Sequence, residues 1–209
     1  APKIDKALKE HGSSKVNLTE ADVDGFYYGF SNRTIWPLFH YFMEYTEFEL
    51  DSWNTYVAVN QKFANAILEK SDDDDTIWVH DYQLMLVPQM VRLQRPNVSI
   101  GFFLHIPFPS FEIFRTLPWR EKILEGLLGS DLIGFHTYNY ERHFLSSVRR
   151  LLGLEVSFNE IYMDDRVIKV DSFPMGIDYK KFSDAAKQHN EKKEKNQSEL
   201  QQRLNAHKE

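Results

Sequence analysis

The sequence predicts an α/β fold built around a mostly parallel sheet. Short, continuously apolar segments at 76–80, 98–105, 131–136 and 167–173 have the length and composition of buried strands. The intervals between them are long enough for a helix and carry apolar residues near helical spacing. Because strands joined through such crossovers lie parallel, the alternation indicates βαβ units. We therefore predict a Rossmann-like, doubly wound domain with helices on both faces of its sheet.

The helices are predicted from their end signals as well as their apolar spacing. Segment 50–70 is expected to be a helix with Asp51 as its N-cap. Segment 138–152 is expected to end at Gly153, a residue type common just past helix C-termini. Further helices are expected at 84–95, closed by Pro96, and within 111–128, broken near Pro118. Residues 156–158 are expected to pair beside the strand at 167–173.

Composition divides the chain into three parts. Residues 1–25 are polar, and because Ala1 stands where an initiator Met would be, we expect this leader to be a truncated start. Residues 26–183 contain the predicted sheet. Residues 184–209 are highly charged and are expected to form a solvated helical tail, with Leu200 and Leu204 as its apolar stripe.

The overall composition excludes several classes of protein. The 209 residues include 25 Lys and Arg against 31 Asp and Glu, a net charge of -6, which argues against a nucleic-acid or anionic-membrane binder. No apolar run approaches the roughly 18 residues that a membrane span needs, and no signal peptide opens the chain. The absence of cysteine excludes disulfides and cysteine nucleophiles. Since it also suits a reducing compartment, we predict a cytoplasmic location.

Histidines follow three of the predicted strands. His80 and Asp81 end the first, His105 follows the second and His136 follows the third. In open α/β sheets, ligands bind outside the carboxyl ends of the strands. Each histidine alone could simply cap backbone groups. Together, the three place titratable side chains on one rim of the sheet, which indicates a functional site.

Several motifs of metal-binding, hydrolytic and nucleotide-binding sites are missing from the sequence, which limits the reactions that this rim could catalyse. The side chains of His80, Asp81, His105 and His136 could bind a metal, but no HExxH or similar short spacing occurs. A G-x-S-x-G elbow, a P-loop and a G-x-G-x-x-G fingerprint are also absent. Residues 72–76 match the D-x-D-x-T of aspartate-nucleophile phosphatases, but those aspartates follow a strand and these precede one. We expect neither a metal nor a cofactor.

Two further segments favour a preorganised sugar site. After His105, Pro107 and Pro109 restrict the path by which the chain leaves its strand, as a rigid site requires. An aromatic-rich loop near residue 30 combines rings with polar groups, which suits the stacking faces and hydroxyls of a sugar, although the rings would equally suit a core. Its members are Tyr27, Asn32, Arg33, Trp36, Phe39, His40 and Tyr41.

Four segments resemble the motifs of trehalose-6-phosphate synthases, the retaining glycosyltransferases of family 20. They are YYGFSNRTIWPLFHY at 27–41, VHDYQL at 79–84, GFFLHIPFP at 101–109 and DLIGFHT at 131–137. The segments occur in the family's order, and the resemblance runs from about residue 18 to residue 178. It corresponds to most of the N-terminal lobe of a two-lobed GT-B glycosyltransferase, so 26–183 would be the acceptor-binding lobe.

The resemblance implies a reaction as well as a fold. It implies that the parent enzyme transfers glucose from UDP-glucose to glucose 6-phosphate with retention, giving trehalose 6-phosphate and UDP. Such enzymes use neither a metal nor a protein nucleophile, and the leaving phosphate helps to deprotonate the attacking hydroxyl. The rate enhancement then comes from positioning of the substrates and from electrostatic stabilisation.

The resemblance also implies a role for individual residues. Tyr27, Trp36 and Asp81 match positions that bind glucose 6-phosphate. His105 matches the histidine beside the donor sugar and is, with Asp81, the implied catalytic residue. Trp36 and Ile106 match positions associated with selection of the anomer. These roles suit the side chains, because an ionised Asp81 accepts hydrogen bonds from hydroxyls and Tyr27 can donate to a phosphate.

The chain departs from the family pattern in two respects. Gln83 stands where the family commonly has His. The family's first strand, its Gly-Gly loop and a preceding Arg are not supplied by residues 1–25, and the second lobe, which holds the UDP phosphates, is also outside the sequence. That C-terminal lobe is therefore an expected partner, and we predict no measurable synthase activity for this chain alone. An unpaired sheet edge would also be compatible with a homo-oligomer.

Two other functions stay open at this point. The chain could come from a non-catalytic homologue that senses a sugar phosphate or regulates a trehalose synthase complex. It could also come from a GT-B enzyme with another donor or acceptor. The retention of Tyr27, Trp36, Asp81 and His105 favours the synthase over the sensor, and the length of the motif match favours it over the other GT-B enzyme.

Overall fold

The structure is a computed structural model that describes residues 7, 8 and 10–193. The chain divides into two compact units, Ala1–Pro174 and Met175–Glu209. The second unit contains the helix α9 (Tyr179–Lys193), whereas Leu200 and Leu204 of the predicted tail lie outside the described residues. The predicted limits at residues 25 and 183 stay predictions.

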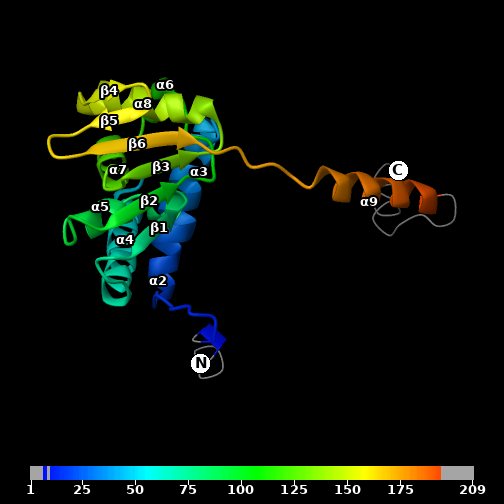
Figure 1. Ribbon diagram of the computed structural model, residues 1–209, viewed down its shortest axis with the longest axis horizontal. Coiled ribbons are helices and arrows are strands. Elements are labelled where there is room, and N and C mark those ends of the chain that lie inside the picture. The colour runs from blue at the N-terminus through cyan, green and yellow to red at the C-terminus, as the bar shows by residue number, and fades with distance from the viewer. Residues whose placement is uncertain (1–6, 9, 194–209) are drawn as a thin grey trace. The chain divides into compact units, whose positions relative to one another are not determined.

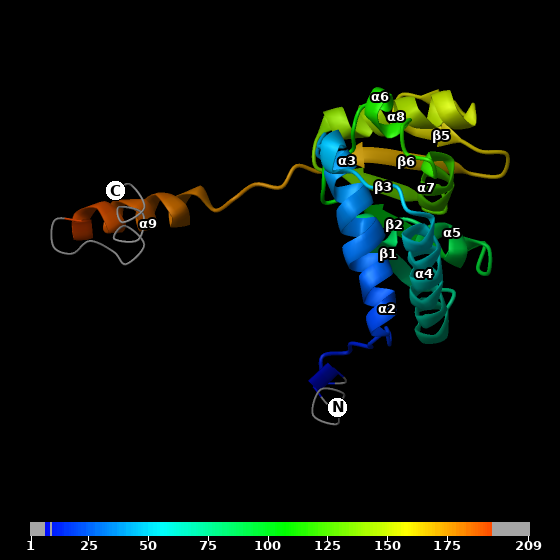
Figure 2. The ribbon, with the colours of Figure 1, turned by 180° about the vertical axis from the view of Figure 1, so that it is seen from behind.

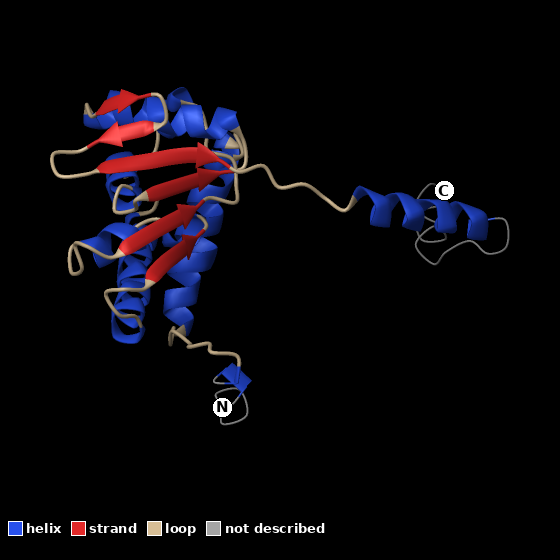
Figure 3. Ribbon diagram, in the orientation of Figure 1, coloured by secondary structure: helices blue, strands red, loops and turns tan. Residues whose placement is uncertain are grey.

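Six strands of the first unit form one sheet in the order β1-β2-β3-β6-β5-β4 (Figures 1 and 3). The parallel strands are β1 (Thr76–His80), β2 (Ser99–Phe103), β3 (Leu132–Phe135) and β6 (Val167–Ser172). The antiparallel strands are β5 (Glu160–Tyr162) and β4 (Glu155–Ser157). The predicted mostly parallel α/β sheet is thus confirmed. Residues 156–158 do not pair beside β6, because a hairpin turn at Phe158 places β5 between β4 and β6.

The helices of the first unit keep most of their predicted places. In chain order they are α2 (Glu20–Val23), η1 (Asp24–Ile35), α3 (Trp36–Phe39), η2 (Met43–Tyr45), α4 (Leu50–Lys70), η3 (Tyr82–Leu84), α5 (Val87–Arg92), α6 (Phe111–Phe114), α7 (Arg120–Leu127) and α8 (Tyr138–Leu152). The bounds of α4 and α8 and the break near Pro118 are as predicted. The helix expected at 84–95 is shorter, because a 3-10 turn precedes it. Asp51 is not the N-cap of α4; that position is Glu49.

The sheet buries one face in the described part of the chain. Along β1, Ile77 and Val79 are buried while Thr76, Trp78 and His80 are exposed. The ribbon views show the helices of this unit gathered on one face of the sheet (Figures 1 and 2). Within the described residues of this unit, the helices thus lie on one face of the predicted α/β sheet. Burial of both faces was predicted because residues 76–80 form a continuous apolar run. In the structure, buried and exposed side chains alternate along this strand, and Trp78 is 65% exposed.

The aromatic-rich segment near residue 30 is a helix and not the predicted loop. A capping box between Thr19 and Asp22 starts α2, and η1 continues it as a π-helix of 12 residues. Phe30 is fully buried and packs against Trp53 and Tyr56 of α4, with ring centroids 5.1 and 4.5 Å apart. This aromatic contact anchors the inner side of η1 and leaves its outer side open to solvent. Wide helical turns of this kind are frequent at functional sites.

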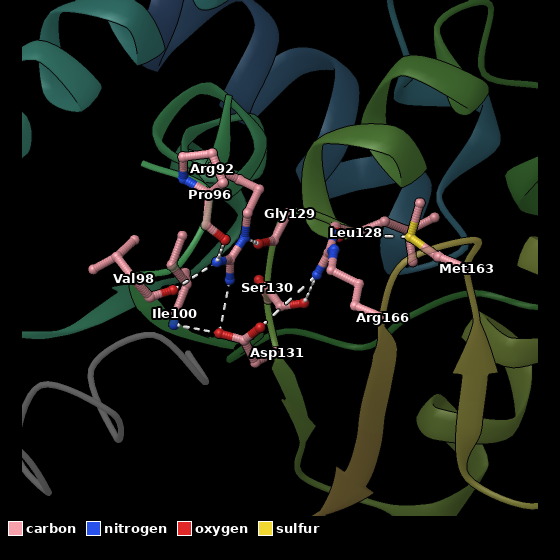
Figure 4. Close-up of polar contacts among 10 residues, drawn as sticks. All are labelled: Arg92, Pro96, Val98, Ile100, Leu128, Gly129, Ser130, Asp131, Met163 and Arg166. Carbon is pink, nitrogen blue, oxygen red and sulfur yellow. Dashed lines mark hydrogen bonds and ion pairs between the residues drawn. The ribbon is translucent and has the colours of Figure 1, made fainter. Parts of the chain in front are cut away.

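A partly buried ion pair joins the amino ends of the parallel strands (Figure 4). Just before β3, the Asp131 carboxylate accepts hydrogen bonds from Arg92 and from the Ile100 amide of β2, both at 2.7 Å. The Arg92 guanidinium also donates to the carbonyls of Gly129 and Val98. Arg166, just before β6, lies 3.9 Å from the same carboxylate. The starts of three parallel strands are thus tied to one carboxylate.

The Asp131 network should contribute measurably to stability. Asp131→Ala leaves the Arg92 guanidinium, whose side chain is only 10% exposed, without its carboxylate. We expect a loss of about 2–4 kcal/mol in the free energy of unfolding, measured by urea titration. Glu112→Ala is the matched control, because its pair with Arg150 is exposed on both sides and should be worth less than about 1 kcal/mol. Equal losses for the two variants would contradict this assignment.

Candidate functional site

The loop after β1 places Asp81 in a conformation that few side chains adopt. Its φ of 71° and ψ of 170° lie in a region populated essentially by glycine. The carboxylate oxygen Oδ1 accepts hydrogen bonds from the amides of Tyr82, at 3.0 Å, and His105, at 3.2 Å. Asp81 itself donates its amide to the Phe103 carbonyl of β2. A strained residue thus links the chain leaving β1 to the chain leaving β2.

The three predicted histidines lie together at the carboxyl ends of their strands. Nδ1 of His80 lies 3.0 Å from Nε2 of His105, and the two rings stack with centroids 5.2 Å apart. His136 meets His105 edge-on at 5.5 Å. The Phe103 ring contacts both His105 and His136, at 4.8 and 5.0 Å. The predicted shared rim is therefore confirmed, because the parallel register brings these strand ends side by side.

The electrostatic setting of His105 favours its neutral form. Burial lowers the pKa of His105, and the neighbouring His80 and His136 lower it further. The Asp81 carboxylate acts in the opposite direction and raises it. Because burial is the largest of these effects, the net direction is downward. A neutral imidazole offers one hydrogen-bond donor and one acceptor to a ligand.

Trp36 and Tyr27 join this rim through Tyr82. Tyr82 is buried, its ring lies 5.7 Å from that of Trp36, and its hydroxyl donates to Asn32 of η1 at 3.0 Å. Burial first, and then the charges of Asp81 and Tyr27, raise the pKa of Tyr82 to about 12. Its hydroxyl therefore stays a donor and holds η1 against the loop after β1. Trp36 and Tyr27 keep 43% and 41% of their side-chain surface exposed, which leaves them free to contact a ligand.

Two polar side chains of α4 support the loop from below. The Tyr56 hydroxyl donates to the Tyr82 carbonyl at 2.8 Å and accepts from the Met85 amide. The Asn60 side chain donates to the Gln83 carbonyl and accepts from the Leu86 amide. Both side chains are fully buried. Because loop backbone groups buried without partners would be costly, these bonds fix the path of residues 82–86.

Ile106 lies apart from the exposed rim. Its side chain is only 5% exposed and belongs to the core beneath the loop. The loop that follows is fixed at two points: the Ser110 amide donates to the Tyr41 hydroxyl at 2.8 Å, and a ring nitrogen of His143 lies 3.1 Å from the Phe108 carbonyl. The rigid path predicted from Pro107 and Pro109 thus has side-chain support as well.

Tyr56, Asn60 and Tyr82 are the supporting residues that sequence reasoning missed. Tyr56 fitted the apolar stripe of its helix, and Tyr82 was one letter of a longer motif. Only Asn60 carried a signal, since a polar residue on the apolar face of a predicted helix requires a buried partner.

The described residues contain no group of three or more His, Cys, Asp or Glu side chains placed to hold a metal ion. Among these residues there is also no helix with the length and apolar content required to cross a bilayer.

A parallel α/β domain with polar residues gathered at the carboxyl ends of its strands defines a class of ligand-binding Rossmann-like domains. The sequence identifies one family within that class. The model of glycosyltransferase family 20 matches residues 1–209, and the chain belongs to this family.

Named relatives align with most of the length of this chain. The UDP-forming alpha,alpha-trehalose-phosphate synthase 1 of Aspergillus fumigatus is 46% identical over 208 residues, which cover 97% of this chain and 40% of that protein. The chain spans less than half the length of the curated relatives it matches. The similarity therefore concerns one portion of longer proteins.

Solved structures give the same result for the fold. An E. coli protein bound with UDP-2-fluoro glucose has a TM-score of 0.74 and 37% identity, over 80% of this chain and 38% of that one. A UDP-forming alpha,alpha-trehalose-phosphate synthase from Burkholderia xenovorans, in complex with glucose-6-phosphate, also has a TM-score of 0.74. Its identity is 32%, over 81% of this chain and 38% of that one.

The strain at Asp81 predicts an unusual order of stability. Asp81→Ala keeps the unfavourable φ and loses both accepted hydrogen bonds, whereas Asp81→Gly loses the same bonds but relieves the φ. We expect the Gly variant to exceed the Ala variant by about 1–2 kcal/mol in free energy of unfolding. Asp74, an exposed loop acid without a positive φ, is the control, and there Ala should be at least as stable as Gly. The same order at both positions would refute strain at Asp81.

Proposed function

We propose that the protein containing this chain transfers glucose from UDP-glucose to glucose 6-phosphate with retention, giving trehalose 6-phosphate and UDP. The observation that carries the proposal is the Asp81 carboxylate, held in a strained conformation between β1 and β2 beside His105. Strain of this kind persists where the surrounding structure enforces it, and it clusters at functional sites. The names of the two ligand-bound relatives support these substrates.

Glucose 6-phosphate would bind between η1 and the loop after β1. Trp36 offers an exposed ring for a face of the sugar, and Asp81 offers its second carboxylate oxygen, Oδ2, to a hydroxyl. Tyr27 lies close enough to Tyr82 to affect its pKa, and its hydroxyl can donate to the phosphate. Trp36 shapes the acceptor pocket and so restricts which anomer of the product forms. Ile106 would act on this selection from the core, through the position of the His105 loop.

Catalysis would rest on positioning and on charge. His105 would hydrogen-bond a donor hydroxyl and stabilise charge as the glycosidic bond loosens. Asp81 would orient the attacking hydroxyl of the acceptor. The proposed scheme uses neither a metal nor a cofactor, and the leaving phosphate accepts the proton of that hydroxyl. The remaining part of the longer protein would hold the UDP, so we expect no synthase activity from this chain alone. The absence of cysteine supports a cytoplasmic site of action.

A titration of the chain with glucose 6-phosphate tests this site directly. In amide NMR spectra we expect saturable shifts confined to Tyr27, Trp36, Asp81 and their neighbours, and weaker shifts with glucose 1-phosphate. Asp81→Asn should weaken the affinity about 10-fold or more, because it removes a charged acceptor of a sugar hydroxyl. Asp74→Asn, an exposed acid in the loop before β1, should leave it unchanged.

Three results would count against the proposal. Saturable shifts that fall elsewhere in the chain would place the acceptor at another site. Equal affinities for the two sugar phosphates would contradict the assigned phosphate position. Tight, selective binding by a complete protein that makes no trehalose 6-phosphate would favour the sugar-phosphate sensor instead.

A further inference from the structure

His80 and His105 share a hydrogen bond that the proposed reaction does not itself require. The bond joins Nδ1 of His80 to Nε2 of His105 at 3.0 Å, and the rings are tilted by only 23° from parallel. The His80 ring also contacts the Trp78 ring, with centroids 4.5 Å apart. The His80 side chain thus contacts two rings although it is exposed.

A hydrogen bond between two imidazole nitrogens restricts which ring nitrogens carry protons. One of the two nitrogens must carry a proton and the other must not. The bond therefore occupies Nε2 of His105 and leaves Nδ1 as the ring nitrogen available to a ligand. The direction of the bond decides whether Nδ1 donates or accepts, because a neutral ring carries only one proton.

The groups around the pair favour His80 as the donor. Three titratable groups act on His105: His80 and Asp81 from the end of β1, and His136 from the end of β3. Burial and the two neighbouring histidines disfavour a positive charge on His105, so His105 enters the hydrogen bond as a neutral ring that can accept at Nε2. With its proton on Nδ1, His80 donates to Nε2 of His105 whether His80 is neutral or charged. Asp81, bound to the amide of His105, favours a proton on Nδ1, the ring nitrogen nearer the backbone.

We propose that His80 is a positioning residue, which holds His105 as the neutral tautomer with its proton on Nδ1 and so makes it a hydrogen-bond donor to a sugar oxygen. The proposal deepens the proposed function, on which its catalytic meaning rests. His80 touches no substrate in this scheme. It acts only through the ring of His105.

The tautomer can be read by NMR in the chain itself. Two-bond 1H–15N spectra of the chain labelled at histidine nitrogens should show a protonated Nδ1 and an unprotonated Nε2 for His105. His80→Asn should retain this pattern, because the amide nitrogen of Asn stands at the place of Nδ1 and can donate. His80→Phe keeps a stacked ring without a donor, and should give a mixture of tautomers and a higher pKa for His105. His136→Phe is the matched control, since that ring contacts His105 edge-on, and should leave the tautomer unchanged.

The catalytic consequence is tested in a complete synthase that carries this segment. His80→Phe should lower kcat about 10- to 100-fold, the usual cost of losing the partner that orients a functional histidine. His80→Asn should stay within about 3-fold of the original rate, close to the cost of one neutral hydrogen bond at most. A His105 that carries its proton on Nε2, or averages both tautomers in the unsubstituted chain, would overturn the proposal. So would a kcat that does not follow the tautomer.

The two proposals fail in different ways. If the unsubstituted synthase makes no trehalose 6-phosphate while the chain shows the fixed tautomer, the proposed function is wrong and the assigned hydrogen bond stands. If it makes the product at a rate insensitive to His80→Phe, the positioning role is wrong and the function stands.

Discussion

The parallel pairing of β1 with β2, and of β2 with β3, is the constraint on which the rest of this unit depends. The register sets His80 opposite Phe103 and Phe103 opposite Gly134. Backbone bonds continue this pairing past the strands, from the Asp81 amide to Phe103 and from the Leu104 amide to Gly134. The residues that follow the strands are therefore delivered side by side. Gly134 suits this arrangement, because a Cβ there would come within 2.6 Å of the Phe103 ring.

The amino ends of the parallel strands carry contacts that stabilise the fold, whereas their carboxyl ends carry the candidate functional site. At the amino edge, Asp131 satisfies Arg92 and the Ile100 amide within a closed network. At the carboxyl ends of the strands, Asp81 has a strained backbone and is half-buried. Strain costs on the order of 1–3 kcal/mol, and it persists only where surrounding contacts enforce it. The buried bonds from Tyr56 and Asn60 provide such contacts, so the site is rigid before any ligand arrives.

Much of the fold and part of the site could be predicted from the sequence. The helix at 138–152 and the strand at 76–80 were placed to the residue, because apolar spacing and a terminal Gly153 are local signals. The shared histidine rim followed from topology alone. The π-helix from Asp24 to Ile35 could not be predicted, since it depends on the contact between Phe30 and a helix that follows it in the chain. The bond between His80 and His105 was equally hidden, because spacing says nothing about which ring nitrogen faces which.

The carboxyl ends of β1 and β2, together with the outer side of η1, form the proposed acceptor site. A crystal structure of the chain with glucose 6-phosphate tests it most directly. We expect the sugar to lie beside Asp81 and Trp36, with its phosphate toward Tyr27. A sugar phosphate bound instead in the pocket of about 550 Å³ between α8 and the β4–β5 hairpin, lined by Glu141, Arg142 and Arg149, would contradict it.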